Sequence, residues 1–435
     1  MKRFIALFVA ALAILGCKAD RDSILKVYNW SNYIDESVIP EFEQWYEEQT
    51  GNPIKVIYQT FDINETMLAK IEKGHEDFDL VCPSDYIIER MINDGLAVPM
   101  DFASLPDSIN YIKNNQSPYI KEVFRKINPN VDANDYSVAF MWGTTGILYN
   151  PRYVTDEEAS TWDVIRNPKF ADRIFIKDAP RDVFGPVLMY LNKSRLDAGE
   201  VTIDELMLDS SDESIAQVEA FMKQVKELAA GWEADFGKEQ MTQERGYVSL
   251  NWSGDAVWAI EEAATVGVEL RYVIPREGSN IWFDGWVIPQ YAKNVKAATY
   301  FIDFMCRPDI AIRNMEETGY VSANGDISVL ESQIDESYPP IDVSYFFPGQ
   351  DSVCVSPVLY APRSVIESCG LLHDWGEDTP KLISMWSRVK GDSANIGTIL
   401  IVGAVLIVLL VFGLRKKLGS SKKHGRSTKA KNKRK

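Results

Sequence analysis

Residues 25–60 read LKVYNWSNYIDESVIPEFEQWYEEQTGNPIKVIYQT, and this stretch decides the fold. Leu25–Asn29 and Ile54–Thr60 are rich in β-branched and aromatic residues, which is typical of strands. Asp35–Thr50 lies between them with apolar residues at helical spacing, and Gly51 follows as a helix stop. The apolar face of this helix consists of Val38, Phe42, Trp45 and Tyr46. A strand, a helix and a strand in this order predict two parallel strands with a helix packed against them.

The alternation of strands and helices continues along the chain. Further strands are predicted at Phe78–Cys82, Tyr136–Trp142, Gly146–Asn150, Arg173–Lys177, Tyr247–Trp252, Leu270–Ile274 and Gly285–Ile288. Helices are predicted from Ser84 to Asp94, from Ser214 to Ala230 and from Val295 to Cys306. Gly143-Thr144-Thr145-Gly146 is predicted as a turn, without the lysine of a phosphate-binding loop. The pattern favours an α/β protein of two units, built on a mainly parallel sheet flanked by helices, without a low-complexity linker between the units.

The charge of the chain is distributed unevenly. The sequence has 46 Lys and Arg against 63 Asp and Glu, but thirteen of the basic residues lie near its two ends. The residues between the ends therefore carry 33 basic side chains against all 63 acidic ones. A body with this excess of acid is expected to avoid nucleic acid and to attract cations.

Histidine and cysteine are scarce. The three histidines are His75, His373 and His424, and none lies near a cysteine or another histidine in the chain. A zinc site or a Ser-His-Asp centre is therefore not expected, and no cofactor is predicted. Besides Cys17 the cysteines are Cys82, Cys306, Cys354 and Cys369, which allow three disulfide pairings that the sequence does not distinguish.

The N-terminal residues are typical of a bacterial export signal. Two basic residues precede an apolar run from Phe4 to Leu15 that is too short to span a bilayer. The run ends in Ile14-Leu15-Gly16-Cys17, which resembles a lipobox. We therefore expect residues 1–16 to be a lipoprotein signal peptide and Cys17 to be lipidated. An ordinary secretory signal with an incidental cysteine is the alternative.

An apolar segment near the C-terminal end predicts a membrane span. Residues 396–414 carry no charge, and as a helix they would be about 28 Å long against a hydrocarbon core of ~30 Å. Residues 415–435 then carry eleven Lys and Arg and no acid, so the positive-inside rule places this tail in the cytoplasm and the acidic body outside. The alternatives are a buried core helix for the apolar segment and nucleic-acid binding for the tail.

Aromatic residues stand beside carboxylates or hydroxyls at the ends of several predicted strands. These segments are Asn29–Tyr33, Pro83–Tyr86, Trp252–Asp255, Trp282–Asp284 and Gly319–Tyr320, with Asp178–Asp182 as a carboxylate pair without an aromatic residue. Ligands of open α/β sheets bind at the carboxyl ends of strands. Carboxylates accept hydrogen bonds from ammonium groups and aromatic faces attract cations, so this set suits an extended, protonated amine. Each residue also has a structural alternative: Trp30 and Trp252 as core residues, and Asp178, Asp182 and Asp255 as helix caps.

Several short segments, spread in order over most of the chain, match the sequence pattern of one protein family. They include Val27-Tyr28-Asn29-Trp30, Lys55-Val56-Ile57-Tyr58, Asn64-Glu65-Thr66-Met67, Asp77-Phe78-Asp79-Leu80-Val81 and Arg307-Pro308-Asp309. From about Leu25 to Lys390 the chain resembles the spermidine/putrescine-binding proteins of bacterial ABC importers, within the extracellular solute-binding superfamily. The resemblance implies a two-lobe periplasmic-binding-protein fold with a hinge and a central ligand cleft. It also implies a polyamine ligand, an ABC transporter permease as partner, no enzymatic activity, and a place at the extracytoplasmic face of the bacterial inner membrane.

The resemblance further implies roles for particular residues. One side of the cleft would be formed by Trp30, Ser31, Tyr33, Ser84 and Tyr86. The remaining contacts would be Asp182, Trp252, Asp255, Trp282, Asp284 and Tyr320, with the three carboxylates holding the amines between Trp30, Trp252 and Trp282. Asn32 departs from the family pattern, in which this position is often acidic. Asp85 and Asp178 are weaker candidates that could replace the missing charge.

The resemblance also maps the two lobes onto the sequence. Lobe one would comprise residues 23–138 and 283–326, and lobe two residues 139–282 and 327–391. A ligand that touches both lobes would stabilise a hinged, closed state. Two other functions stay open: a membrane-tethered sensor or binder of another small cation without transport, and a glycosidase-like enzyme with Asp182 and Asp284 as its acid–base pair. A C-terminal span is unusual in the family, and it would hold a binder close to its permease.

Overall fold

The structure of the protein is a computed structural model that describes residues 21–233 and 236–391. Residues up to Leu382 form one compact unit, and a second unit begins at Ile383, inside helix α18 (Thr379–Lys390).

Both predicted membrane anchors lie outside the described residues. These anchors are the signal peptide with Cys17 and the apolar segment at residues 396–414. Among the residues that are described, no helix is both long and apolar enough to cross a membrane. The two anchors therefore stay predictions from the sequence.

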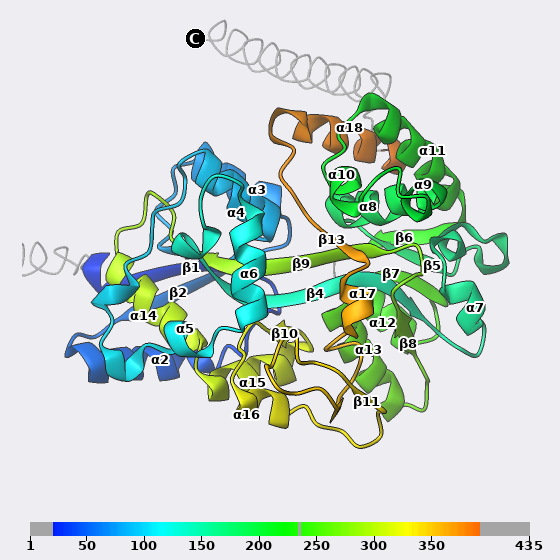
Figure 1. The fold of residues 1–435 in the computed structure, drawn as a ribbon. Helices are drawn as coiled ribbons and strands as arrows, with labels where there is room; N and C mark the ends of the chain where they lie inside the picture. The colour runs from blue at the N-terminus through cyan, green and yellow to red at the C-terminus, as the bar shows by residue number, and fades with distance from the viewer. Residues whose placement is uncertain (1–20, 234–235, 392–435) are drawn as a thin grey trace, which may run out of the picture. The chain divides into compact units, whose positions relative to one another are not determined.

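One large mixed sheet runs through the first unit (Figure 1). Its strands are β1 (Ile24–Trp30), β2 (Lys55–Phe61), β3 (Leu80–Val81), β4 (Ser137–Tyr149), β5 (Ile174–Lys177), β6 (Ala229–Glu233), β7 (Val248–Trp252), β8 (Arg271–Val273), β9 (Ser279–Val287), β10 (Val321–Ser322) and β13 (Cys369–Leu371). The order is β2-β1-β3-β9-β4-β7-β5-β6, with β8 and β10 paired to β4 and β13 paired to β9. Strands β11 (Pro340–Ile341) and β12 (Val353–Cys354) form a separate pair. The predicted α/β class is confirmed.

The prediction of a mainly parallel sheet is wrong for the middle of the sheet. β1 pairs in parallel with β2 and β3, and β5 pairs in parallel with β6 and β7, as strand–helix–strand units do. The long strands β4 and β9 instead pair antiparallel with each other, and they also pair antiparallel with β7 and β3 respectively. These two strands pass from the β1–β3 group to the β5–β7 group and so join them (Figure 1).

Strand β4 replaces the turn predicted at Gly143–Gly146, because it is continuous and buried over its whole length. Its glycines permit close packing instead of a reversal of the chain. A Cβ atom on Gly143 would lie 2.5 Å from Trp282 Cζ2, and one on Gly146 would lie 2.6 Å from the ring of Tyr272. Glycine inside a strand often marks such a close approach.

Helices lie on both sides of the sheet, with α8, α10 and α11 on one side of its β5–β7 end and α12 and α13 on the other (Figure 1). Those of the first unit include α2 (Val38–Thr50), α3 (Asn64–Glu72), α4 (Asp85–Asn93), α5 (Tyr111–Asn115), α6 (Pro118–Ile127), α7 (Asp156–Ala159), α8 (Pro180–Leu191), α9 (Lys193–Asp197), α10 (Ile203–Met207), α11 (Asp212–Leu228), α12 (Gly237–Thr242), α13 (Ser253–Thr265), α14 (Val295–Met305), α15 (Pro308–Thr318), α16 (Ile327–Glu331) and α17 (Arg363–Ile366). Gly51 ends α2 in the left-handed conformation, with a φ of 69°, as its position predicts. Strand β6 follows directly after α11 and was not predicted.

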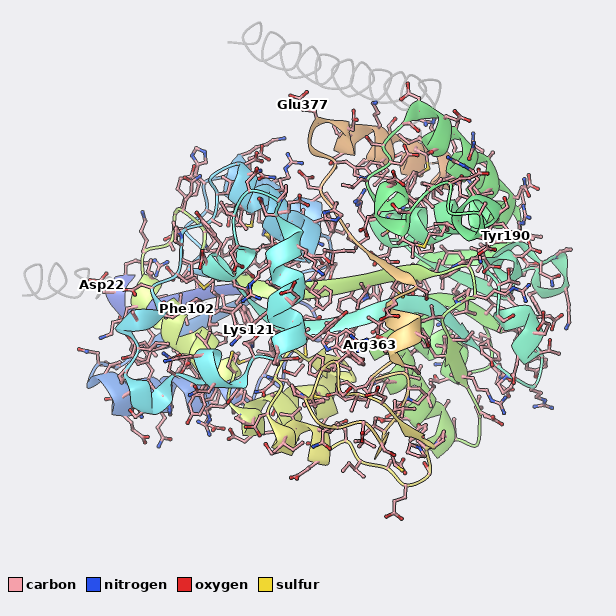
Figure 2. All side chains as sticks on the ribbon, viewed as in Figure 1. Asp22, Phe102, Lys121, Tyr190, Arg363 and Glu377 are labelled. Atoms are coloured by element: carbon pink, nitrogen blue, oxygen red, sulfur yellow. The ribbon has the colours of Figure 1, made fainter. Side chains whose placement is uncertain are left out.

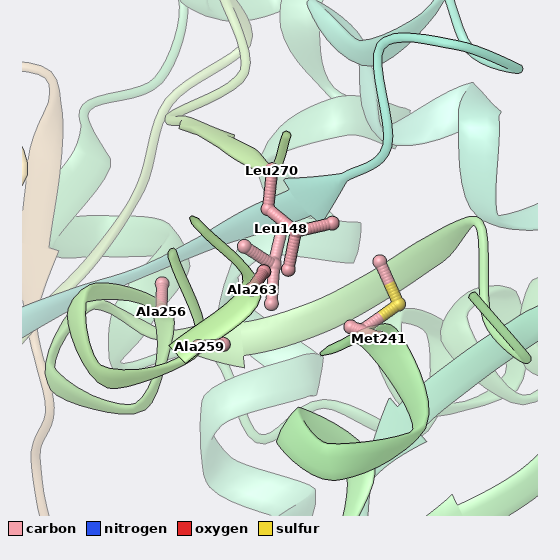
Figure 3. Packing of buried hydrophobic residues seen from close by; sticks show 6 residues of the cluster. All are labelled: Leu148, Met241, Ala256, Ala259, Ala263 and Leu270. Atoms are coloured by element: carbon pink, nitrogen blue, oxygen red, sulfur yellow. The ribbon is translucent and has the colours of Figure 1, made fainter. Parts of the chain in front are cut away.

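A small apolar cluster holds α13 against β4 (Figure 3). It consists of Leu148, Met241, Ala256, Ala259, Ala263 and Leu270. The three alanines lie three and four residues apart and therefore share one face of α13. Because their side chains are small, α13 packs closely on the sheet, and its first turn is fixed directly after Trp252.

The four cysteines of the described residues carry free thiols. Cys82 and Cys306 are buried, whereas Cys354 and Cys369 are half-buried. None of the three disulfide pairings that the sequence allows is present.

Candidate functional site

One cleft of about 120 Å³ brings together most of the residues singled out in the sequence. Its lining includes all eleven main candidates: Trp30, Ser31, Tyr33, Ser84, Tyr86, Asp182, Trp252, Asp255, Trp282, Asp284 and Tyr320. The weaker candidates Asn32 and Asp178 line it too, whereas Asp85 does not. The structure makes these residues neighbours, and their part in binding a ligand stays a prediction.

Strand β1 and the turn after it supply the first lining residues. Trp30 ends β1, and its ring packs against Phe61 at the end of β2 with 4.6 Å between centroids. The chain then turns at Asn32, whose φ of 53° lies in the left-handed region that asparagine tolerates. Ser31 Oγ donates a hydrogen bond of 2.8 Å to Asp62. Phe61 and Asp62 also line the cleft, although the sequence patterns do not single them out.

The first residues of α3 hold the start of α4 in place. Asn64 Nδ2 donates to Ser84 Oγ over 3.0 Å and to Tyr86 Oη over 3.1 Å. Tyr86 Oη in turn donates to Glu65 Oε1 over 3.1 Å. Asn64 and Glu65 line the cleft as well. Both belong to a motif that carries the family resemblance, and that motif was the available signal for their place in the site.

Asp284 lies at the centre of an aromatic box. It stands inside β9 and not at a strand end, which corrects the predicted bounds of that strand. Tyr33 Oη donates a hydrogen bond of 2.6 Å to Asp284 Oδ2. The rings of Tyr33 and Tyr320 are 5.0 Å apart, and those of Tyr320 and Trp282 are 5.7 Å apart. These rings enclose the carboxylate with apolar walls.

The second oxygen of Asp284 is the most unusual polar atom of the cleft. Oδ1 is buried and has no hydrogen-bond partner among the described residues. Burial raises the pKa of Asp284 to about 7, although hydrogen bonds from Tyr33 and Ser84 favour the ionised form. The neighbouring charge of Asp182 also raises this pKa. A buried, incompletely satisfied carboxylate is stabilised when a cation binds to it.

Asp182 lies in the first turn of α8, close to Asp284. Its Oδ1 accepts hydrogen bonds from Thr145 Oγ1 at 3.3 Å and from Asn280 Nδ2 at 3.2 Å. Burial raises the pKa of Asp182, and these hydrogen bonds, with one from Trp252, oppose the rise. Ala179 holds the N-cap position of α8, with Asp178 directly before it and Asp182 in the first turn.

Asp85 does not contribute to the cleft, contrary to its place among the weaker candidates. The residue is fully buried behind the lining. Its Oδ1 accepts a hydrogen bond of 2.8 Å from the backbone N–H of Tyr86, and its Oδ2 accepts one of 3.3 Å from the backbone N–H of Phe283. Asp85 therefore ties α4 to β9 and does not replace the acid missing at position 32.

Asp255 lines the cleft but is already paired with cations of the protein. Its Oδ2 lies 2.6 Å from Lys177 Nζ, and its Oδ1 lies 3.2 Å from Lys238 Nζ. Lys177 Nζ is also 3.2 Å from Glu233 Oε1. Both oxygens of Asp255 thus already face lysine ammonium groups of the protein, and its predicted contact with a ligand amine stays a prediction. A lysine at the end of a buried strand is the signal for such a pair, but Glu233 comes from the unpredicted strand β6.

The cleft carries more acid than base. Its carboxylates are Asp62, Glu65, Asp178, Asp182, Asp255 and Asp284, and its basic residues are Lys177, Arg181 and Lys238. Arg181 is buried, stacks its guanidinium 4.4 Å from the ring centroid of Trp375, and donates to the backbone carbonyl of His373. Burial lowers the pKa of Arg181. Unlike exposed acids such as Asp22 and Glu377 at the periphery (Figure 2), several cleft carboxylates are shielded from solvent.

This arrangement can hold a small organic cation. Aromatic rings provide walls for methylene groups and faces for cation–π contacts, and carboxylates accept from ammonium groups. The described residues include no group of three His, Cys, Asp or Glu side chains placed to hold a metal ion.

Comparisons with known proteins agree with the fold. The model of the family described as bacterial extracellular solute-binding protein matches residues 42–335. The putrescine-binding periplasmic protein PotF of Escherichia coli (strain K12) is 31% identical over 350 residues, which cover 76% of this chain and 86% of PotF. The spermidine/putrescine-binding periplasmic protein of the same strain is 29% identical over 335 residues, covering 74% of this chain and 84% of the relative.

A solved structure extends the likeness to three dimensions. The spermidine/putrescine ABC transporter substrate-binding protein PotD of Streptococcus pneumoniae superposes with a TM-score of 0.61 at 27% identity. The match covers 85% of this chain and 98% of PotD. The family resemblance and the periplasmic-binding-protein type of α/β fold that the sequence predicts are confirmed.

Proposed function

Because this chain belongs to the bacterial extracellular solute-binding proteins, we propose that it captures a polyamine outside the cytoplasm and delivers it to an ABC transporter. The observation that carries the proposal is the Asp284 carboxylate with its buried, unpartnered Oδ1. This oxygen lies among the rings of Tyr33, Trp282 and Tyr320 in a cleft with excess acid. A protonated amine would satisfy it, and the rings would flank the methylene chain.

Relatives support the choice of ligand. PotF is named as a putrescine-binding protein and the second relative as a spermidine/putrescine-binding protein. In our proposal Asp182 and Asp284 hold ammonium groups between Trp30, Trp282 and Tyr320, with Asp62 and Glu65 at the side of the cleft formed by β2 and α3. The predicted division into lobes supplies a hinge that would close on the bound amine.

The proposal includes attachment to a membrane through Cys17, through residues 396–414, or through both. A tether would raise the local concentration of the loaded protein near its permease. The alternative of a tethered sensor uses the same cleft and differs only in its partner. A polyamine-uptake assay in cells lacking the protein separates the two, because a sensor is dispensable for uptake itself.

Calorimetric titration of the full-length chain with putrescine, spermidine, cadaverine and lysine tests the proposal directly. We expect putrescine or spermidine to bind with a Kd of roughly micromolar or tighter, which is about 8 kcal/mol of binding free energy. Lysine, whose carboxylate would meet the acidic cleft, is expected to bind much more weakly. Absence of polyamine binding in the micromolar range would show that the proposal is wrong.

A further inference from the structure

The end of the cleft formed by Trp252 and Asp255 contains an ammonium group that belongs to the protein. Lys177 ends β5 and is fully buried, and its Nζ makes ion pairs of 2.6 Å with Asp255 and 3.2 Å with Glu233. The same nitrogen lies 4.3 Å from the ring centroid of Trp252. A carboxylate pair together with an aromatic face is the environment that a polyamine nitrogen would require.

This ammonium group keeps its charge. Burial alone would lower the pKa of Lys177, but the charges and hydrogen bonds of Asp255 and Glu233 raise it overall. The pKa of Asp255 is lowered despite burial, because Lys177 and Lys238 stabilise its ionised form. Each oxygen of Asp255 thus already faces a lysine ammonium.

Asp284 and Asp182 meet a different set of partners in the cleft. The Oδ1 atom of Asp284 lacks a partner among the described residues, and Asp182 accepts hydrogen bonds from Thr145 at 3.3 Å, from Asn280 at 3.2 Å and from the Trp252 side chain. The lining as a whole has six carboxylates against three basic side chains, so its excess of acid is limited. A cleft of about 120 Å³ is also smaller than the ~300–1,000 Å³ of pockets for drug-sized ligands.

We propose that Lys177 acts as a resident ammonium group that fills the Trp252–Asp255 end, so that the cleft selects a diamine over a triamine. The inference rests on the proposed polyamine-binding function and specifies its ligand class. A diamine places its charges near Asp284, Asp182 and the carboxylates beside them. A triamine of spermidine length would bring a further ammonium toward Lys177, where like charges repel.

Titration of the full-length chain with putrescine and with spermidine tests this selectivity. The wild-type protein should bind putrescine roughly tenfold or more tighter than spermidine, a preference that one like-charge contact can produce. Lys177→Met removes the ammonium group and keeps an unbranched side chain. It should bring spermidine affinity up to or above putrescine affinity.

Lys169→Met is the matched control. Lys169 also pairs with a carboxylate, that of Glu158 at 2.8 Å, and also lies near an aromatic ring, 4.9 Å from the centroid of Phe170, but it does not line the cleft. This variant should therefore retain the preference for putrescine. If Lys169→Met removes the preference as fully as Lys177→Met does, net charge and not occupation of the Trp252 face sets the selectivity, and the inference fails.

Replacement of Lys177 leaves the buried carboxylates of Asp255 and Glu233 without its compensating charge, which destabilises the folded protein. The double variant Lys177→Met/Glu233→Gln removes one of the two acids and leaves the Asp255–Lys238 pair, and thermal unfolding verifies that it folds. It should show the same gain for spermidine. Equal affinity of the wild-type protein for both amines would overturn the inference while leaving the proposed function intact, whereas absence of binding by both would overturn the proposed function itself.

Discussion

At the scale of single residues, the proposed contact between Asp284 and a ligand ammonium group gives the most direct test of cation binding. Replacement by asparagine keeps the shape and removes the charge. We expect Asp284→Asn to weaken polyamine binding roughly tenfold or more, consistent with ~1.5–3 kcal/mol for a hydrogen bond to a charged group. Calorimetric titration of the full-length variant measures the change.

Asp303→Asn provides the control for Asp284→Asn. Asp303 is also buried, its pKa is also raised to about 7 by burial, and its Oδ1 accepts from the backbone N–H of Ile112 at 3.0 Å. It does not line the cleft. Affinity should stay unchanged in this variant. Equal losses in the two variants would show that the effect on binding comes from general destabilisation.

The pKa of Asp284 predicts how binding depends on pH. With a pKa of about 7 in the free protein, this carboxyl group becomes protonated as the pH falls below 7, and a neutral carboxyl no longer pairs with an ammonium group. Polyamine affinity should therefore decrease as the pH is lowered from 8 to 6, and binding near pH 6 should release a proton. Titrations in buffers of different ionisation enthalpy measure that proton. A flat profile would contradict the assignment.

The carboxyl group of Asp284 also makes the stability of the free protein depend on pH, and here a rise in pH is unfavourable, whereas it favours polyamine binding. Its folded-state pKa lies above the ordinary value of 3.8, so between these two values the folded chain binds more protons than the unfolded chain. The free energy of unfolding contributed by Asp284 therefore falls as the pH rises through this range. Asp284→Asn should remove this dependence, and the unliganded variant should unfold at a higher temperature than the wild type at pH 7.5.

At the scale of elements, strand β4 shows where local sequence patterns stop being sufficient. Gly143-Thr144-Thr145-Gly146 has the composition of a turn, yet tertiary contacts with Trp282 and Tyr272 decide its conformation. Strand β6 begins directly after α11, and the helical sequence pattern of α11 gives no local signal for it. Strands β1, β2 and β5 and helix α2 were predictable because their own periodicity and caps specify them. Parallel or antiparallel pairing of β4 and β9 has no such local signal.

Gly143 offers a test of this explanation. A Cβ atom there would lie 2.5 Å from Trp282, so Gly143→Ala should displace that ring, weaken polyamine binding and cost about 1–3 kcal/mol of stability as overpacking does. Gly231→Ala in β6 is the matched control, since its Cβ would meet Phe175 at an ordinary 3.8 Å. Titration measures the polyamine affinity of both variants, and thermal unfolding measures their stability. Normal behaviour of Gly143→Ala would mean that β4 tolerates a side chain there.

The candidate site follows the same division between local and long-range information. Trp30, Trp282 and Asp284 could be proposed from aromatic–carboxylate pairs and the family resemblance. The ion pair of Lys177 with Asp255 joins residues 78 positions apart, and its second acid, Glu233, lies on a strand that the sequence does not reveal. Which carboxylates are left for a ligand therefore depends on packing that only the folded chain specifies.

At the scale of the whole molecule, capture and attachment should be separable. All residues that line the cleft lie between Trp30 and Leu372, before the predicted span at residues 396–414 and after Cys17. Removal of residues 392–435 together with Cys17→Ala should move the protein from the membrane fraction to the soluble extracytoplasmic fraction, while polyamine affinity stays unchanged. Fractionation followed by titration measures both properties.

The substitution Cys17→Ala and the C-terminal truncation, each made alone, show whether the protein has one membrane anchor or two. If lipid and span both attach the chain, Cys17→Ala alone and the C-terminal truncation alone should each leave the protein in the membrane fraction, since either anchor suffices. If only the span attaches it, the truncation alone should release it. Persistence of the doubly changed protein in the membrane fraction would contradict both anchors and would require attachment through the body. Because tethering acts on delivery by raising local concentration, the released protein should bind polyamine normally yet support slower uptake at the same cellular amount.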